Sequence, residues 1–170
     1  NLNRNTSKLL WTKCFGCDGG LMTTAFDHII ETQGGKLGLE KDYQYTAVQG
    51  TWHFDQYSHV SSISKYVKVV SGDEDDLAAK IEQYGPASVA VDASNWSFYL
   101  CKKGIYDEPQ WSSTYLDHGI GCVGFGSDDE DKYWIIHNSW GDSWGEKGYM
   151  RMIWYNNQCG VATTASIPLA

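Results

Sequence analysis

The sequence from residue 114 to residue 126 reads TYLDHGIGCVGFG. Its histidine, His118, stands between an aspartate and a glycine at the start of an apolar run with regularly spaced glycines, a pattern typical of a β-strand. A histidine at the end of a strand can face a cleft and titrate near neutral pH. It can equally be a structural residue that is hydrogen-bonded at the edge of a sheet.

A second stretch, residues 138 to 149, reads NSWGDSWGEKGY. The side-chain carbonyl of Asn138 can orient an imidazole, and the indole of Trp140 can shield such a hydrogen bond from water. A turn that carries two core tryptophans, Trp140 and Trp144, accounts for the same residues. Taken alone, the stretch leaves a catalytic and a purely structural interpretation open.

A third stretch, residues 16 to 22, reads GCDGGLM and precedes a predicted helix. The paired glycines, Gly19 and Gly20, let a backbone approach a ligand closely, but they also serve an ordinary turn into a helix. Cys14 and Cys17 have the spacing of a redox motif or of half a zinc site. No second cysteine pair and no nearby histidine completes a metal site in the sequence, which therefore predicts neither a metal nor a cofactor.

Apolar periodicity predicts two helices, over residues 21–31 and 73–84. Alternating or β-rich runs predict strands over residues 87–93, 119–125, 133–137 and 148–154. Helices early in the chain and strands late in it indicate an α+β fold. We expect residues from 1 to about 85 to form the remainder of a helical lobe with the crossover, and residues from about 86 to 170 to form a mainly β lobe.

The composition excludes several classes of protein. With 42% hydrophobic and 20% charged residues the chain is not of the disordered class, and no apolar stretch approaches the roughly 18 residues of a membrane span. Thirteen basic against 21 acidic residues give a formal net charge of −8. Because phosphate binding needs a basic surface, we expect no nucleic-acid partner. Because no apolar stretch is long enough to span a membrane, we expect no membrane partner.

The stretches GCDGGLM, TYLDHGIGCVGFG, NSWGDSWGEKGY and CGVATTASIP (residues 159–168) follow one another in an order that resembles the papain-like cysteine proteases, in particular the cathepsin L branch. The resemblance runs from about Ser7 to the last residue. It implies a papain-like two-lobe α+β fold and a cysteine endopeptidase, lysosomal or extracellular, that uses no metal or cofactor. It also implies a peptide or protein substrate and, as further partners, a propeptide or a cystatin-type inhibitor.

By this resemblance His118 is the general base and acid of a thiolate–imidazolium pair. Asn138 orients its ring, and Trp140 covers the hydrogen bond between the two side chains. The chemistry requires such a set, because a thiol that attacks near neutral pH must be ionised and an adjacent imidazolium lowers its pKa.

The resemblance also assigns substrate-binding positions. Gly20 hydrogen-bonds an extended substrate backbone as an added strand. The complete set is Gly19, Gly20, Leu21, Met22, Ala90, Leu116, Asp117 and Thr164. The positions of this set that line the main specificity pocket are mostly apolar, with no acid at its base, so the resemblance implies a preference for an apolar side chain at the second residue before the cut bond.

The resemblance breaks at the nucleophile. In this family the catalytic cysteine lies about 130–150 residues before the histidine, in a C-G-S-C-W type run. His118 has 117 residues ahead of it, and no such context surrounds Cys14, Cys17, Cys101, Cys122 or Cys159. We therefore expect an N-terminal segment or a second chain to supply the cysteine, and the 170-residue chain alone to be inactive. The alternative is a catalytically inactive papain-family homologue that acts as a binding or structural protein.

The disulfide bonds that the resemblance implies meet tryptophan at one partner position. It pairs a cysteine near Cys14 with the position of Trp52, and Cys159 with the position of Trp111. Either the bridges are lost and the indoles fill the space, or the two tryptophans are cysteines misread from a codon near UGG or from a reassigned UGA codon. The masses of peptides that cover residues 45–55 and 105–115 distinguish these explanations.

Overall fold

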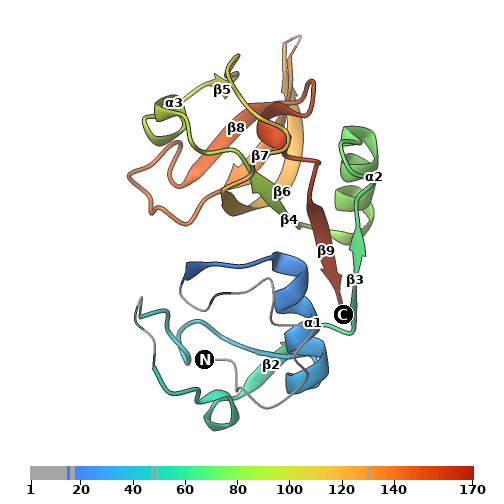
Figure 1. Ribbon diagram of the computed structural model, residues 1–170, viewed down its shortest axis with the longest axis vertical. Helices are drawn as coiled ribbons and strands as arrows, with labels where there is room; N and C mark the ends of the chain where they lie inside the picture. Colours follow the sequence, from blue (N-terminus) through green and yellow to red (C-terminus); the bar gives the residue numbers. More distant parts are fainter. Residues whose placement is uncertain (1–14, 16–17, 47, 49, 130) are drawn as a thin grey trace. The chain divides into compact units, whose positions relative to one another are not determined.

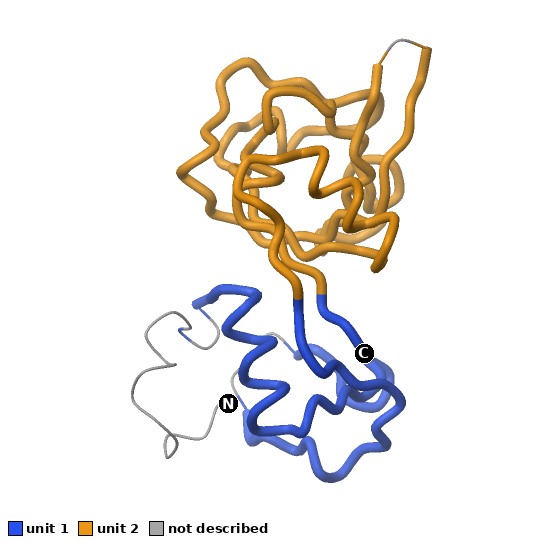
Figure 2. The backbone as a smooth tube through the Cα atoms, turned by 90° about the vertical axis from the view of Figure 1, so that its right-hand side faces the viewer, with its two compact units in different colours: residues 1–66, 168–170 blue, residues 67–167 orange. Residues whose placement is uncertain are grey.

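A computed structural model of the chain describes residues 15, 18–46, 48, 50–129 and 131–170. The chain forms two compact units (Figures 1 and 2). The first consists of Asn1–Tyr66 with Pro168–Ala170, and the second of Val67–Ile167. No helix in the described ranges is long and apolar enough to cross a membrane.

The first unit contains one long helix, α1, which spans Met22–Gln33. It ends at Gly34, whose φ of 60° and ψ of 31° lie in the left-handed region that glycine adopts without strain. The helix predicted over residues 21–31 is thereby confirmed. The other described elements of this unit are the short helix η3 (Phe54–Gln56) and the antiparallel pair β1 (Lys36–Gly38) and β2 (His59–Ser62).

The apolar side of α1 is only partly covered by the described residues. Phe26 packs beside Tyr66 with ring centroids 5.7 Å apart, yet no residue of α1 is fully buried. The apolar face of α1 is therefore only partly buried, whereas the helix of the second unit has fully buried apolar residues.

The second unit is built on a seven-stranded sheet (Figure 1). Its strand order is β3-β9-β4-β6-β7-β8-β5. The pairs β4–β6, β4–β9, β6–β7 and β7–β8 are antiparallel, and β5–β8 is parallel. Its strands are β3 (Lys65–Lys68), β4 (Ala87–Val91), β5 (Ile105–Tyr106), β6 (His118–Asp128), β7 (Asp131–His137), β8 (Tyr149–Ile153) and β9 (Ala165–Leu169). Strands β4, β6, β7 and β8 confirm the four that the sequence predicts.

The helix α2, Glu74–Tyr84, lies in the second unit with the strands. Asp73 caps it, because its carboxylate accepts a hydrogen bond from the backbone N–H of Asp76 at 2.9 Å. Leu77, Ala78 and Ile81 form its buried face, as the sequence predicts. Two short helices, α3 (Trp96–Tyr99) and η4 (Gln158–Gly160), flank the sheet strands in sequence and were not predicted.

Three cysteines in the described ranges are free thiols: Cys101, Cys122 and Cys159. Trp52, at one of the implied disulfide positions, stacks on Phe54 with ring centroids 5.4 Å apart. Cys14 and Cys17, and with them their implied pairings, lie outside the described residues.

Candidate active site

The antiparallel pairing of β6 and β7 brings His118 and Asn138 together. His118 is the first residue of β6, and Asn138 follows the last residue of β7, in a register that places Gly121 opposite His137. The imidazole Nε2 of His118 lies 2.9 Å from the side-chain oxygen Oδ1 of Asn138. Two residues that are 20 positions apart in the chain thus form one hydrogen-bonded pair.

The protonation of this pair follows from a second hydrogen bond. The backbone N–H of Ser139 donates to the same Oδ1 of Asn138 at 2.8 Å, which identifies that atom as the amide oxygen. Since an amide oxygen only accepts, the imidazole Nε2 carries the proton and donates it. Nδ1 is then the ring nitrogen that can take up and release a proton during a reaction.

Aromatic rings enclose the pair. Trp140 stacks on the imidazole of His118, with ring centroids 4.9 Å apart and an interplanar angle of 27°. The fully buried Phe98 packs nearly perpendicular to both rings, at 6.3 Å from His118 and 5.7 Å from Trp140. Asn138 is only 4% exposed, so its hydrogen bond to the half-buried imidazole is shielded from water.

The turn that carries Asn138 and Trp140 is fixed by hydrogen bonds. The backbone N–H of Asn138 donates to the carbonyl of Gly148 at 2.9 Å, and that of Gly148 donates to the carbonyl of Trp144 at 2.8 Å. At the end of the turn the carboxylate of Glu146 accepts two hydrogen bonds from Arg151, at 2.8 and 3.1 Å. These bonds to Arg151 hold the pKa of Glu146 below its ordinary value.

Four predicted substrate-binding residues lie in this same unit, close to His118 along the chain or across the sheet. Ala90 pairs with Gly119, the neighbour of His118, and its backbone N–H donates to the carbonyl of Thr164 at 3.1 Å. Leu116 and Asp117 immediately precede His118, and the backbone N–H of Asp117 donates to the carbonyl of Val91 at 3.1 Å. The backbone therefore places Ala90, Leu116, Asp117 and Thr164 around the start of β6.

The other predicted substrate-binding residues, Gly19, Gly20, Leu21 and Met22, belong to the first unit and form the entry to α1. Gly19 has a φ of 102°, which side-chain-bearing residues rarely adopt, and its carbonyl accepts a hydrogen bond from the backbone N–H of Phe15 at 2.8 Å. The backbone conformation of the turn therefore favours glycine at position 19.

Asp92, which sequence reasoning missed, braces two segments that meet at the site. It is a buried carboxylate at the end of β4 that accepts hydrogen bonds from the backbone and hydroxyl of Ser94 and from the backbone of Ser112 at 2.8 Å. Burial alone raises the pKa of Asp92, but the hydrogen bonds outweigh it and leave the pKa below its ordinary value.

Asp117 makes a second link between the same two parts of the chain. Its carboxylate accepts a hydrogen bond from the backbone N–H of Ala93 at 2.8 Å. The aspartates in Val91-Asp92 and Leu116-Asp117 carry no local sequence signal for this arrangement. Phe98, also missed, could have been singled out from the aromatic run Trp96-Ser97-Phe98-Tyr99.

The described thiols are poor nucleophiles. Burial raises the pKa of Cys122 and of Cys159 to about 12, and it also raises the pKa of Cys101. Among the residues that the structure describes, no cluster of histidine, cysteine, aspartate or glutamate side chains could hold a metal ion. Within the described site, the His118–Asn138 pair is the arrangement whose geometry suits proton transfer.

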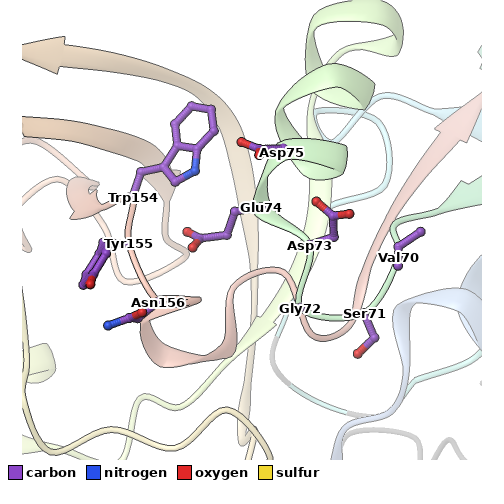
Figure 3. Close-up of a pocket in the computed structure, with 9 residues that line it drawn as sticks. All are labelled: Val70, Ser71, Gly72, Asp73, Glu74, Asp75, Trp154, Tyr155 and Asn156. Atoms are coloured by element: carbon purple, nitrogen blue, oxygen red, sulfur yellow. The ribbon is translucent and has the colours of Figure 1, made fainter.

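A pocket of about 630 Å³ lies at the start of α2, beside Trp154, Tyr155 and Asn156 (Figure 3). Two of its three acidic residues have structural tasks: Asp73 caps α2, and Glu74 accepts hydrogen bonds from the Trp134 indole at 2.9 Å and from the Asn157 backbone at 2.7 Å. We therefore assign this pocket no part in the chemistry.

Comparison with known proteins places this geometry in a family. The sequence model described as "Papain family cysteine protease" matches residues 5–169. A "Cathepsin L-like peptidase" of Aedes aegypti is 43% identical over 156 residues, which are 91% of this chain and 45% of the relative. A "Cathepsin L-like" protein of Caenorhabditis elegans is 45% identical over 91% of this chain and 46% of its own length. The chain thus spans slightly less than half the length of these relatives.

Solved structures agree with the sequence comparison. The digestive procathepsin L 3 of Tenebrio molitor larval midgut superposes with a TM-score of 0.79 at 41% identity, over 91% of this chain and 50% of its own. The bromelain protease from Ananas comosus, solved with the E64 inhibitor, superposes with a TM-score of 0.83 at 33% identity. The match covers 92% of this chain and 73% of the bromelain chain. The predicted α+β, papain-like fold is confirmed. The chain belongs to the papain family of cysteine proteases, with cathepsin L-like proteins among its relatives.

Proposed function

We propose that the protein of which this chain is part is a cathepsin L-like cysteine endopeptidase. One observation carries the proposal: the imidazole of His118 donates through Nε2 to Asn138 at 2.9 Å beneath the indole of Trp140. A histidine with a purely structural role at the edge of a sheet has no need of this shielded orientation, which leaves Nδ1 free for proton transfer.

The first half of the reaction makes a thioester. The catalytic thiolate, supplied by a part of the protein outside these 170 residues, attacks the carbonyl carbon of the peptide bond and forms a C–S bond. The imidazolium of His118 gives its Nδ1 proton to the leaving nitrogen as the C–N bond breaks. The amine departs, and the imidazole is left neutral, held through Nε2 by Asn138.

The second half regenerates the enzyme. Neutral His118 accepts a proton from water at Nδ1 while the water oxygen attacks the thioester carbon. The C–S bond breaks, the acid product leaves, and the thiolate and imidazolium are restored. Neither half requires a metal, a cofactor or an oxidant.

The substrate is a peptide or protein bound in extended form. In the first unit, Gly19 and Gly20 present backbone groups to the main chain of the substrate. In the second unit, Asp117 precedes His118 directly and contributes to substrate binding. In the second unit, Ala90, Leu116 and Thr164 contribute to the binding of an apolar side chain at the second residue before the cut bond. A basic side chain is disfavoured there, because the pocket residues supply no acid.

The setting of the enzyme follows from the same assignment. We infer a lysosomal or extracellular protease that is restrained by a propeptide or a cystatin-type inhibitor. The formal net charge of −8 fits an acidic compartment, in which protonation of carboxylates relieves part of that charge.

The test uses the full-length protein, activated and compared with its His118→Ala variant. Hydrolysis of a fluorogenic peptide with leucine or phenylalanine two residues before the cut, and labelling by an epoxide that alkylates active-site thiolates, are the expected results for the natural protein. The variant should lose both. A folded, processed protein that neither hydrolyses nor reacts is instead an inactive binding or structural homologue, and the proposal is then wrong.

A further inference from the structure

An acceptor triplet for N-linked glycans, Asn95-Trp96-Ser97, lies at the start of α3 in the second unit (Figure 1). The motif Asn-X-Ser, with X other than proline, is the sequence at which the secretory pathway attaches glycans to asparagine. Such triplets also occur in proteins that carry no glycan, so the triplet alone does not identify a site. The fold must in addition leave the amide nitrogen of the asparagine, Nδ2, able to carry a large substituent.

The hydrogen bond that Asn95 makes does not involve Nδ2. Its Oδ1 accepts from the backbone N–H of Ser97 at 3.0 Å, and no residue in the described ranges forms a hydrogen bond with Nδ2. An N-linked sugar replaces one hydrogen of Nδ2 and leaves Oδ1 an amide oxygen. The glycosylated side chain therefore keeps the hydrogen bond that fixes the turn into α3.

Water reaches Nδ2 of Asn95. Among the residues that the structure describes, the buried side-chain nitrogen and oxygen atoms without a hydrogen-bond partner are Nδ2 of Asn138 and Oγ of Ser166. Nδ2 of Asn95 is not one of these buried atoms, so it is open to solvent. Both neighbours along the chain are exposed as well, Ser94 and, at 74%, Trp96. A glycan can therefore leave the surface here without displacing a packed side chain.

The hydroxyl of Ser97 is occupied in the folded protein. It donates to the carboxylate of Glu108 at 2.5 Å and, since its one proton is used there, accepts from the hydroxyl of Tyr106 at 2.8 Å. Glycans are transferred to a chain as it enters the secretory pathway and before it folds, so these bonds do not oppose the modification. They do affect the choice of variant, because a substitution that removes the hydroxyl also removes two contacts of the fold.

The surface beside Asn95 is one that a glycan can cover. Trp96 and Tyr99, 51% exposed, lie with ring centroids 6.0 Å apart, and Leu100 is 67% exposed. Contiguous exposed apolar side chains on a soluble domain usually mark a surface that binds something. A sugar ring presents a face of C–H bonds, whose partly positive hydrogens are attracted to the negative face of an indole. A glycan on Asn95 starts one residue away from the indole of Trp96.

We propose that Asn95 carries an N-linked glycan that shields the indole of Trp96; this rests on the lysosomal or extracellular setting of the proposed function. The donor is a lipid-linked oligosaccharide diphosphate. The bond between the first sugar carbon and the diphosphate oxygen breaks, the same carbon forms a bond to Nδ2, and Nδ2 loses one proton. The lipid diphosphate is the leaving group, so no oxidant or reductant takes part.

The test maps glycans on the full-length protein expressed in eukaryotic cells. Trypsin cuts after Lys80 and Lys102, so the peptide of residues 81–102 reports on Asn95 alone. The other acceptor triplet, Asn5-Thr6-Ser7, lies in a different peptide and outside the described residues. Enzymatic removal of the glycan in heavy-oxygen water converts a glycosylated asparagine into an aspartate that carries the heavy oxygen. We expect this label in residues 81–102 of the wild-type protein.

Two variants test whether the triplet directs the modification. Asn95→Asp keeps an oxygen that can accept from the backbone of Ser97 but has no amide nitrogen, so it should fold normally and lose the glycan. Its rate of hydrolysis of the fluorogenic peptide should equal that of the wild-type protein. Ser97→Thr keeps both the hydroxyl and the triplet, and it should keep the glycan.

Hydroxyl-radical oxidation measures the cover over Trp96 in the same tryptic peptide. Oxidation of Trp96 should be about twofold lower in the glycosylated protein than in Asn95→Asp, since the sugar takes roughly half of the exposed indole out of water. Tyr155 is 67% exposed and lies in a different tryptic peptide. Its oxidation is the control and should be equal in the two proteins.

The inference is overturned if residues 81–102 carry no label in protein that has entered the secretory pathway, or if Trp96 is oxidised equally in the wild-type protein and in Asn95→Asp. Protein that stays in the cytosol overturns it together with the lysosomal or extracellular setting. The peptidase function fails separately, when the glycosylated, activated protein does not hydrolyse the fluorogenic peptide.

Discussion

The indole N–H of Trp144 donates a hydrogen bond to the backbone carbonyl of Phe98 at 3.1 Å, across 46 residues of sequence. Both residues are buried, and Phe98 in turn packs against His118 and Trp140. Trp144 therefore stabilises the site indirectly, by holding Phe98 in place. Trp140 contacts the imidazole of His118 itself.

Replacing Trp144 by phenylalanine tests this support. The variant removes the indole donor while the Phe98 carbonyl keeps the backbone N–H of Cys101 at 3.4 Å, and the loss of one such hydrogen bond costs about 0.5–1.5 kcal/mol. We expect the free energy of unfolding of the full-length protein in urea to fall by that amount. The matched change Trp96→Phe, on an exposed indole, should stay within about 0.5 kcal/mol. Equal effects of the two substitutions would contradict the assigned role of Trp144.

Replacing Asn138 by alanine tests the orientation of the imidazole. The variant loses the acceptor at Nε2, so the ring can rotate away from the position in which Nδ1 transfers protons. We expect kcat to fall by about a hundredfold with a small change in KM. Gln110→Ala, which removes an exposed carboxamide, is the control and should leave both constants unchanged. A loss confined to KM would place Asn138 in substrate binding instead.

Replacing Asp92 by asparagine tests the brace between residues 92–94 and Ser112. Because the folded pKa of Asp92 lies below its ordinary value of 3.8, the carboxylate stabilises the fold above that pH, and this contribution is lost as pH falls through the folded pKa. We expect the variant to be less stable by about 1.5–3 kcal/mol at pH 6, since the lost bonds involve a charged acceptor.

The stability difference between the natural protein and the Asp92→Asn variant should narrow below pH 3.8. Urea unfolding between pH 3 and pH 7 measures it. A difference that is constant over this range would show that the charge of Asp92 plays no part.

The sequence resemblance pairs position 111 with Cys159, and the structure brings the two segments together at Asp92. The backbone N–H of Asp92 donates to the carbonyl of Cys159 at 2.8 Å, while its carboxylate accepts from Ser112. We therefore predict that Trp111→Cys forms a disulfide with Cys159 under oxidising conditions and raises stability by about 2–4 kcal/mol.

Peptide mapping with and without reductant detects the new Trp111→Cys disulfide. Trp111→Ser is the control, since it removes the same indole without offering a thiol. A free thiol at position 111 after oxidation would mean that the segments do not approach closely enough.

Much of the second unit could be predicted from the sequence because its elements have strong local patterns. The alternation of Ala87–Val91 and the acidic first turn and apolar face of α2 have one reasonable interpretation each. The strands β5 and β9 and the helix α3 were missed because two to five residues carry too little periodicity. Their structure depends on partners distant in sequence, as when β5 pairs in parallel with β8.

The site divides in the same way. His118, Asn138 and Trp140 stand out because their residue types suit one reaction and their order resembles a family. The braces made by Asp92 and the edge-on packing of Phe98 depend on which segments meet in three dimensions, and an aspartate or phenylalanine in a strand or helix is common. No local pattern distinguishes Asp92 from an ordinary aspartate, and the aromatic run around Phe98 marks that residue without showing which rings it packs against.

The rate of thiol alkylation as a function of pH tests the central claim most directly. In the activated full-length protein a thiolate paired with the imidazolium of His118 should react with iodoacetamide at full rate from about pH 5, since a histidine-paired thiol of this kind has a pKa of about 3–4. In the His118→Ala variant the rate should rise only near the ordinary cysteine pKa of about 8.5. If both proteins show the same rise near pH 8.5, His118 does not ionise a catalytic thiol and the account is wrong.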